Sequence, residues 1–169
     1  MFESLLPNPL HPAVVHFPIV LALLVPLFAI GALVMIRRQA RPVRAWGLAT
    51  ALFVALSISA WVAVETGEDT SERVESVVAE APLEAHEEAA ENFLRLSVLV
   101  TVIAVAGLAA GRVGQGARLA ATLGALVLLV AGWRVGHSGG ALVYQHGAAS
   151  AYATGSAGCR DCPPPPETH

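Results

Sequence analysis

Histidines are the residues of this chain with the clearest capacity for chemistry, and five of the six lie near the ends of long apolar segments. They are His11 and His16 before the first segment, His86 before the third, and His137 and His146 after the fourth. Imidazole is the commonest protein ligand of transition metals and also an axial ligand of haem iron. Arg134 lies about one helical turn before His137, so a cation and an imidazole share a helix face. The sequence therefore predicts a metal or haem site built from histidines.

Haem is favoured over an isolated metal ion at this site. Haem takes axial histidines, needs cationic partners for its propionates and requires an apolar pocket between helices. Arg134 and Arg95 are the candidate propionate partners, although Glu91 competes for Arg95 from four residues away. Copper or zinc bound by three imidazoles is the alternative. A di-iron carboxylate site is not expected, because paired Glu-x-x-His motifs are absent from the sequence. We expect one or two b-type haems.

The histidines can be ranked as ligands, because a ligand must be buried and face the inside of the bundle. His16 lies one turn into the first helix and should meet this condition better than His11, which is near the helix start. His137 lies at the mouth of the last helix, and His86 can reach a shallow site. We therefore expect His16, His86 and His137 to be the ligands, followed by His146 and then His11.

Four apolar windows can position these histidines, at residues 17–36, 45–64, 93–110 and 119–135. Hydrophobic residues make up 55% of the chain and charged residues 14%, which is too apolar for an ordinary soluble domain. A membrane-spanning helix needs about 20 largely apolar residues. The sequence predicts an all-α integral membrane four-helix bundle over residues 1–147, with helices near 14–36, 45–64, 83–110 and 119–137. No internal repeat is obvious.

Local signals add detail to this bundle. Pro18 should kink the first helix beside His16, and the pair Gly139-Gly140 should end the last helix just beyond His137. Valines at helical spacing predict a short amphipathic extramembrane helix over residues 71–80. Trp46 and Trp61 fit interfacial belts on opposite sides of the bilayer. Residues 148–169 should form an extended, Pro-rich tail.

The arginines predict how the bundle is oriented, since the chain has no lysine. Arg37, Arg38, Arg41 and Arg44 lie between the first two helices, and Arg112 and Arg118 lie between the last two. The loop from Glu65 to Glu91 holds ten acidic residues and only Arg73. The positive-inside rule places the arginine loops in the cytoplasm. In a bacterial inner membrane, both termini and the five helix-end histidines then face the periplasm. The acidic loop either receives a basic cytochrome c or is simply a solvated face.

Two cysteines lie in the tail, with the spacing Cys159-x-x-Cys162. Pro163 follows where a c-type haem attachment motif needs histidine, so that motif is excluded. In an oxidising compartment the pair is expected to form a disulfide.

Several motifs together resemble a known bacterial family. They are His11-Pro-x-x-Val-His16-Phe-Pro18, Thr66-Gly67, His86-Glu87, and Gly136-His137-x-Gly-Gly-x-Leu-Val-Tyr144-x-His146-Gly147. The pattern resembles the membrane proteins grouped as "domain of unknown function 2231". That resemblance covers about residues 8–147 and implies a four-span protein associated with c-type cytochrome domains, and hence with electron transfer.

We therefore expect a membrane-bound b-type haem protein. It would relay electrons between the quinol pool, or a membrane partner, and a periplasmic redox protein. An electron-transfer subunit is more consistent with the sequence than a stand-alone enzyme. The alternatives are an accessory subunit of a larger respiratory or photosynthetic complex, or a membrane protein that binds copper or zinc. Lipid is an expected partner, a homo-oligomer is compatible with the sequence, and no nucleic-acid site is expected.

Overall fold

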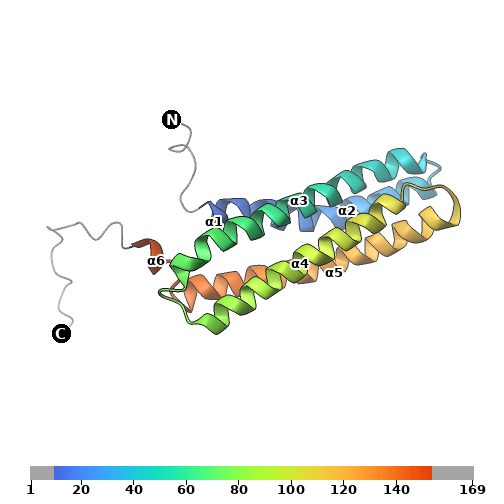
Figure 1. Ribbon diagram of the computed structural model, residues 1–169. Coiled ribbons are helices and arrows are strands. Elements are labelled where there is room, and N and C mark those ends of the chain that lie inside the picture. The colour runs from blue at the N-terminus through green and yellow to red at the C-terminus, as the bar shows by residue number, and fades with distance from the viewer. Residues whose placement is uncertain (1–9, 154–169) are drawn as a thin grey trace, which may run out of the picture.

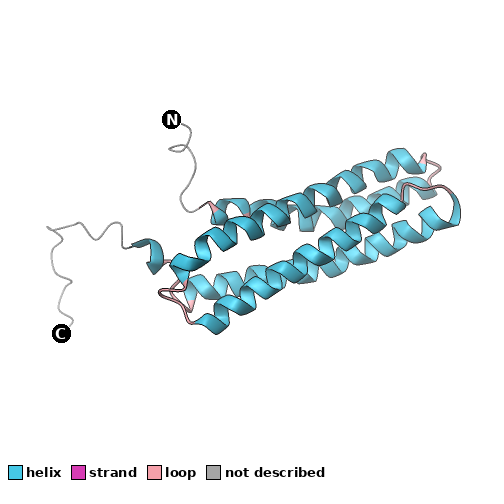
Figure 2. Cartoon of the chain, viewed as in Figure 1, coloured by secondary structure: helices cyan, strands magenta, loops and turns pink. Residues whose placement is uncertain are grey.

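The computed structural model describes residues 10–153, except for the side chains of residues 69, 70, 72 and 73. Its four long helices are α2 (His16–Arg37), α3 (Pro42–Val74), α4 (Glu80–Ala106) and α5 (Gly111–Tyr144), and its two single-turn helices are α1 (His11–Val14) and α6 (Ser150–Ala153). The long helices lie side by side (Figure 1), and no strand occurs in the described part of the chain (Figure 2). The contacts α2–α3, α3–α4, α4–α5 and α5–α2 close a ring of four helices.

The bundle has two chemically different ends. The arginine end carries the α2–α3 loop with Arg38 and Arg41 and the α4–α5 loop with Arg112 nearby. The histidine end carries α1, the α3–α4 turn, the last turns of α5 and α6 (Figure 1). All four long helices are long and apolar enough to cross a membrane. The all-α four-helix fold predicted from the sequence is therefore confirmed.

Proline and glycine place several helix boundaries. Pro42 lies in the first turn of α3, where a missing N–H costs no helical hydrogen bond. Pro18 has no N–H for the carbonyl of Val14, so one helical hydrogen bond is missing between α1 and α2, while Val15 keeps a helical conformation. The kink expected beside His16 stays a prediction. Gly111 begins α5 with φ of 73°, a left-handed conformation that glycine adopts without strain.

The core is filled by alanines and a few large side chains. Trp46, Phe53 and Leu128 are fully buried, and alanines of α2 such as Ala29 pack with them in one cluster. Small residues let the helices approach closely, which is how helices pack in a bilayer. Large apolar side chains such as Leu123 are exposed on the outside of the bundle, where lipid tails cover them.

Three local expectations are wrong. The pair Gly139-Gly140 does not end the last helix, since α5 continues to Tyr144 and packs there, with Gly139 against His86 and Leu142 against Leu83. The amphipathic segment is not a separate helix, because its first residues are the last turn of α3 and the chain then turns towards α4. Its apolar face still packs, with Val78 against Leu83 and Leu142. Trp46 is not in an interfacial belt, since it is buried and donates from Nε1 to the carbonyl of Ala104 at 2.8 Å.

The structure also reveals an internal repeat that relates α3 to α5. Residue n of α3 corresponds to residue n+72 of α5, as in the pair Trp61 and Trp133. Buried positions coincide under this shift in the pairs Trp46/Arg118, Ala49/Ala121, Thr50/Thr122, Phe53/Ala125 and Leu56/Leu128. Hydrogen bonds coincide too, because Thr50 and Thr122 each donate to the carbonyl four residues earlier. The two helices are therefore equivalent elements of the bundle.

The first helix of each half repeats in the same way. The buried residues of α2 and α4 correspond in the pairs Ala22/Phe93, Val25/Ser97, Ala29/Val100 and Ala32/Ala104. Both halves begin at the histidine end, cross to the arginine end and return. The bundle is thus two copies of one helical hairpin, related by an approximate twofold axis that runs along the bundle.

Candidate functional site

A cavity with two lobes occupies the core at the histidine end of the bundle. One lobe, of about 490 Å³, is lined mainly by α3 and α4, and the other, of about 340 Å³, mainly by α5 with α1 and α2. His11 and His86 line both lobes and therefore stand where the lobes meet. Small-molecule sites usually have volumes of about 300–1,000 Å³. Each lobe is large enough to hold part of an organic cofactor.

The two lobes are equivalent in the repeat but differ in chemistry. The α3 residues Val64, Gly67, Glu68 and Ser71 line the first lobe, and their α5 equivalents Gly136, Gly139, Gly140 and Val143 line the second. Glu68, Glu87 and Glu91 give the first lobe a carboxylate rim, and we call it the acidic lobe. No acidic side chain lines the second lobe among the described residues, and we call it the apolar lobe.

The ring of His11 is held by α3. Its Nδ1 donates to the carbonyl oxygen of Ala63 at 2.9 Å and lies 3.4 Å from Oγ1 of Thr66. The Thr66 hydroxyl donates its own proton to the carbonyl oxygens of Val62 and Ala63, so its oxygen can only accept from the histidine. Both partners of Nδ1 are therefore acceptors, and the ring carries its proton on Nδ1.

The ring of His86 is held by α5 in the same way. Its Nδ1 lies 2.8 Å from Oγ of Ser138, and that hydroxyl donates to the carbonyl oxygen of Val135 at 3.0 Å. The serine proton is therefore committed to Val135, and Nδ1 of His86 donates to the serine oxygen. Ala63 and Thr66 of α3 correspond to Val135 and Ser138 of α5, so the repeat holds both histidines through equivalent partners.

Glycine completes the support of each ring. A Cβ on Gly67 would lie 3.2 Å from Cε1 of His11, and a Cβ on Gly139 would lie 3.0 Å from Cε1 of His86. Both glycines are also equivalent in the repeat. Alanine would be too close to the imidazole at either position, so the absence of a side chain lets each ring lie directly on its neighbouring helix.

These contacts leave Nε2 of each ring ready to bind a ligand. In the described part of the chain, every hydrogen bond of His11 and His86 uses Nδ1. The proton on Nδ1 leaves the lone pair on Nε2. A metal-ligating histidine has this arrangement, in which a hydrogen bond from the other ring nitrogen fixes the tautomer and the ring orientation. The site therefore offers two imidazole nitrogens from two equivalent hairpins.

The other predicted ligands lie elsewhere. His16, His137 and His146 are exposed, and none of them lines either lobe. The ring of His137 is stacked on Trp133, with 5.4 Å between centroids. The sequence ranked His16 above His11, but the structure places them in the opposite order, because five helical residues rotate His16 by roughly 140° away from the side that faces α3. Of the five histidines, the structure brings together His11 and His86.

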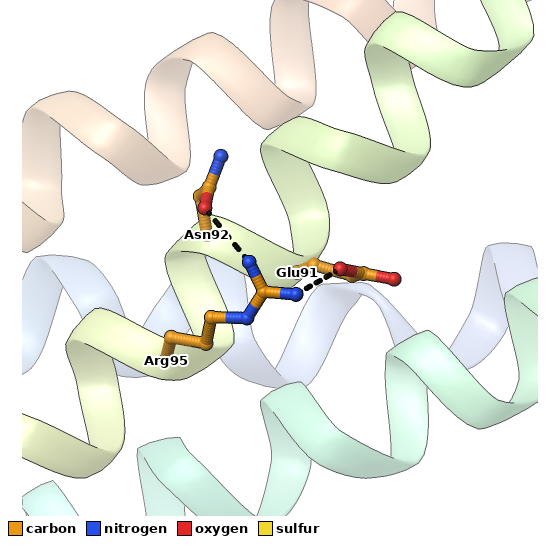
Figure 3. A network of polar contacts seen from close by, with 3 residues as sticks. All are labelled: Glu91, Asn92 and Arg95. Atoms are coloured by element: carbon orange, nitrogen blue, oxygen red, sulfur yellow. Dashed lines mark hydrogen bonds and ion pairs between the residues drawn. The ribbon is translucent and has the colours of Figure 1, made fainter.

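Of the predicted cations, Arg95 is the one that the structure brings close to the cavity. Arg134 is exposed and lines neither lobe. Arg95 forms an ion pair with Glu91 of the acidic rim and donates to Oδ1 of Asn92 at 3.3 Å, as Figure 3 shows. The competition between Glu91 and an anionic ligand for Arg95, expected from the sequence, is therefore visible as a formed ion pair.

A closed metal site is not assembled among the described residues. They contain no group of three or more histidine, cysteine, aspartate or glutamate side chains placed to hold a metal ion. Copper or zinc bound by three imidazoles stays an alternative prediction. Cys159 and Cys162, the expected disulfide, lie outside the described residues, as does most of the expected tail.

Comparison with known proteins adds a family to this geometry. The family model described as "Predicted membrane protein (DUF2231)" matches residues 7–151. The chain belongs to this family. The match spans the whole bundle and all five helix-end histidines of this DUF2231 protein, and it stops before the two cysteines. No curated protein and no solved structure shows significant similarity to the chain.

Thr66, Ser138 and Gly139 were not recognised as site residues from the sequence. Two signals could have found them. Thr66-Gly67 and Ser138-Gly139 are the same hydroxyl-glycine pair, and each lies five residues after a tryptophan, Trp61 or Trp133. The five-residue spacing from tryptophan to the hydroxyl residue is the same in α3 and α5. It indicates the repeat and the helix positions that face the histidines.

Proposed function

We propose that this DUF2231 protein is a membrane electron-transfer protein that binds one b-type haem between His11 and His86. The observation that carries the proposal is the equivalence of the two rings. Each has its Nδ1 proton donated to a neighbouring helix and its Nε2 directed away from that bond, and both line one cavity. Two such nitrogens from facing helices are the donor set of a bis-histidine haem.

The surroundings of the rings fit this cofactor in two respects. Gly67 and Gly139 let the two imidazoles lie close against α3 and α5, which fixes how the rings are presented. Val74, Leu83 and Leu142 line the acidic lobe and would give a bound haem uncharged walls. Arg95, which pairs with Glu91 of the acidic rim, would be the cation available to its propionates.

When bound, a haem supplies an iron that gains and loses one electron reversibly. The residues of the chain bind the group, orient its ligands and exclude water. His11 and His86 hold the group, the hydroxyls of Thr66 and Ser138 orient the two rings, and the apolar walls limit the access of water.

We infer the direction of electron flow from the charges at the two ends of the bundle. The arginine end is expected in the cytoplasm by the positive-inside rule, which places the histidine end at the periplasmic face of a bacterial inner membrane. There the carboxylates around Glu68 and Glu87 attract a cationic redox protein such as a c-type cytochrome. The quinol pool or a membrane partner supplies the electrons from within the bilayer.

The optical spectrum of the purified protein, produced with adequate haem supply, tests the proposal. We expect the bands of a low-spin b-type haem after reduction, at about one haem per chain. Metal analysis of the same sample separates this outcome from the alternatives. Stoichiometric copper or zinc without haem indicates a metal-binding protein, and the absence of both leaves a non-catalytic accessory subunit.

A further inference from the structure

Three properties of the apolar lobe indicate the kind of molecule that it can hold. First, each carboxylate of the pair Glu68 and Glu87 has an uncharged counterpart. Glu68 corresponds to Gly140 of α5, and Glu87, which follows His86, corresponds to Pro12, which follows His11. The two lobes therefore differ in charge. The acidic lobe attracts protons and cations, whereas the apolar lobe can accept an uncharged group.

The second property is a flat wall. Gly132, Gly136 and Gly140 follow one another at four-residue spacing along α5 and all line the apolar lobe. A Cβ on Gly136 or Gly140 would meet no atom within 4 Å, so the helix backbone faces open space there. A planar ring can lie against such a wall, whereas a row of branched side chains would hold it away.

The third property is depth in the bilayer. Twenty residues, 45–64, separate Arg44 from Glu65, which is the length of about 20 residues that one membrane span requires. Glu65 and its equivalent His137 therefore mark the edge of the hydrocarbon region. The apolar lobe crosses this edge, since it is lined by Pro18 and Gly132 on one side of it and by Tyr144 on the other.

We propose that the apolar lobe binds a lipid-soluble quinol, with its ring against the glycine wall and its isoprenoid tail leaving between α2 and α5. Ile19 lines the lobe on the membrane side of this edge and is exposed, so it offers the tail an apolar exit towards lipid. Tyr144 lines the outer, polar part of the lobe. A saturated acyl chain needs neither the flat wall nor the polar edge.

This assignment rests on the proposed function for its electron acceptor. Oxidation of a quinol to a quinone releases two electrons and two protons. The electrons pass singly to a one-electron acceptor of the haem class, which a periplasmic oxidant must reoxidise between the two transfers. The protons leave through the acidic lobe, where Glu68 and Glu87 can accept them and release them to water. The apolar lobe thereby holds the lipid-soluble quinol, and the acidic lobe carries away the released protons.

Photolabelling with a decyl-tailed azidobenzoquinone, together with equilibrium binding of the parent decyl-tailed quinone, tests the assignment. We expect labelled peptides from the start of α2 and the end of α5. The variants Gly136→Leu and Gly140→Leu should weaken binding at least tenfold, because the new side chains fill the lobe. Gly31→Leu and Gly47→Leu are matched controls, since both glycines lie in helices beside open space and outside either lobe. Ile19→Trp narrows the lobe from the opposite wall and serves as a second variant.

The quinol proposal can be rejected independently of the haem proposal. Label outside the lobe, unchanged affinity in the variants, or equal displacement by a decyl chain without a ring would overturn the quinol site. A low-spin haem spectrum without quinone binding therefore rejects this inference alone. Quinone binding that maps to the lobe in a protein without haem rejects the proposed cofactor alone.

Discussion

His11 and His86 lie near the starts of two helical hairpins and together line one site. Each donates its Nδ1 proton to an acceptor on the returning helix of its own hairpin, and each ring lies on a glycine of that helix. Both side chains line both lobes of the cavity. A ligand bound between them would be held from two sides by the same chemistry.

Ser138 should act as a positioning residue for His86. The change Ser138→Ala removes the oxygen that accepts from Nδ1, and loss of such a partner typically lowers metal affinity about 10–100-fold. We expect a comparable loss of haem affinity in titrations of the apoprotein, with a shifted reduction potential in the haem that remains. Ser59→Ala is the control, because Ser59 bonds only to the carbonyl of its own helix at Leu56. Equal effects of the two changes would contradict the assigned role.

Gly139 should be intolerant of a side chain. In Gly139→Ala the new Cβ would lie 3.0 Å from Cε1 of His86, so the ring must move away from its hydrogen bond. We expect lower haem occupancy and a fraction of high-spin haem in the optical spectrum. Gly47→Ala places a methyl group in open space on α3 and should leave the spectrum unchanged. A fully low-spin spectrum in Gly139→Ala would show that the ring does not depend on this contact.

Trp46 should dominate the stability of the arginine end. Its side chain is fully buried, its Nε1 donates to Ala104, and Gly107 lies directly against the indole. The change Trp46→Ala is expected to cost about 3–5 kcal/mol of unfolding free energy, measured by reversible unfolding in mixed micelles. Trp133 is 68% exposed, so Trp133→Ala should cost far less. Similar losses in the two variants would contradict the packing described here.

The membrane orientation predicts opposite results for two reporter fusions. A fusion after Arg41, in the α2–α3 loop, should report a cytoplasmic location, and a fusion after Glu75, in the α3–α4 turn, should report a periplasmic one. The physical reason is that Arg37 and its neighbours resist translocation. The same location for both fusions would mean that α3 does not span the membrane.

Much of the fold was predictable because the apolar windows are long and the arginines lie in only some of the loops. The side on which the histidines gather was predictable for the same reason. The helix ends were less predictable. A Gly-Gly pair often ends a helix, but Gly139-Gly140 lies within a helix that packs on His86. The sequence shows where the glycines are, but the structural effect of each glycine depends on the residues that pack against it.

The ligand pair was not predictable from position along the helices. His16 lies one turn deeper than His11, yet it is exposed, because the five residues between them rotate it by roughly 140° around the helix. The repeat of α3 in α5 would have matched the partners of the two histidines, Thr66 and Ser138. It would not have matched His11 with His86, because these are 75 residues apart, against 71 or 72 at the buried core positions of the first helices.

The low-temperature electron paramagnetic resonance spectrum of the oxidised protein tests the central claim most directly. The wild-type protein should show a low-spin bis-histidine signal, and His11→Ala and His86→Ala should each lose haem or convert it to high spin. His16→Ala and His137→Ala, which change exposed histidines outside both lobes, should keep the wild-type signal. An unaltered low-spin signal in His11→Ala or His86→Ala, or its loss in His16→Ala or His137→Ala, would contradict the assignment of the ligand pair.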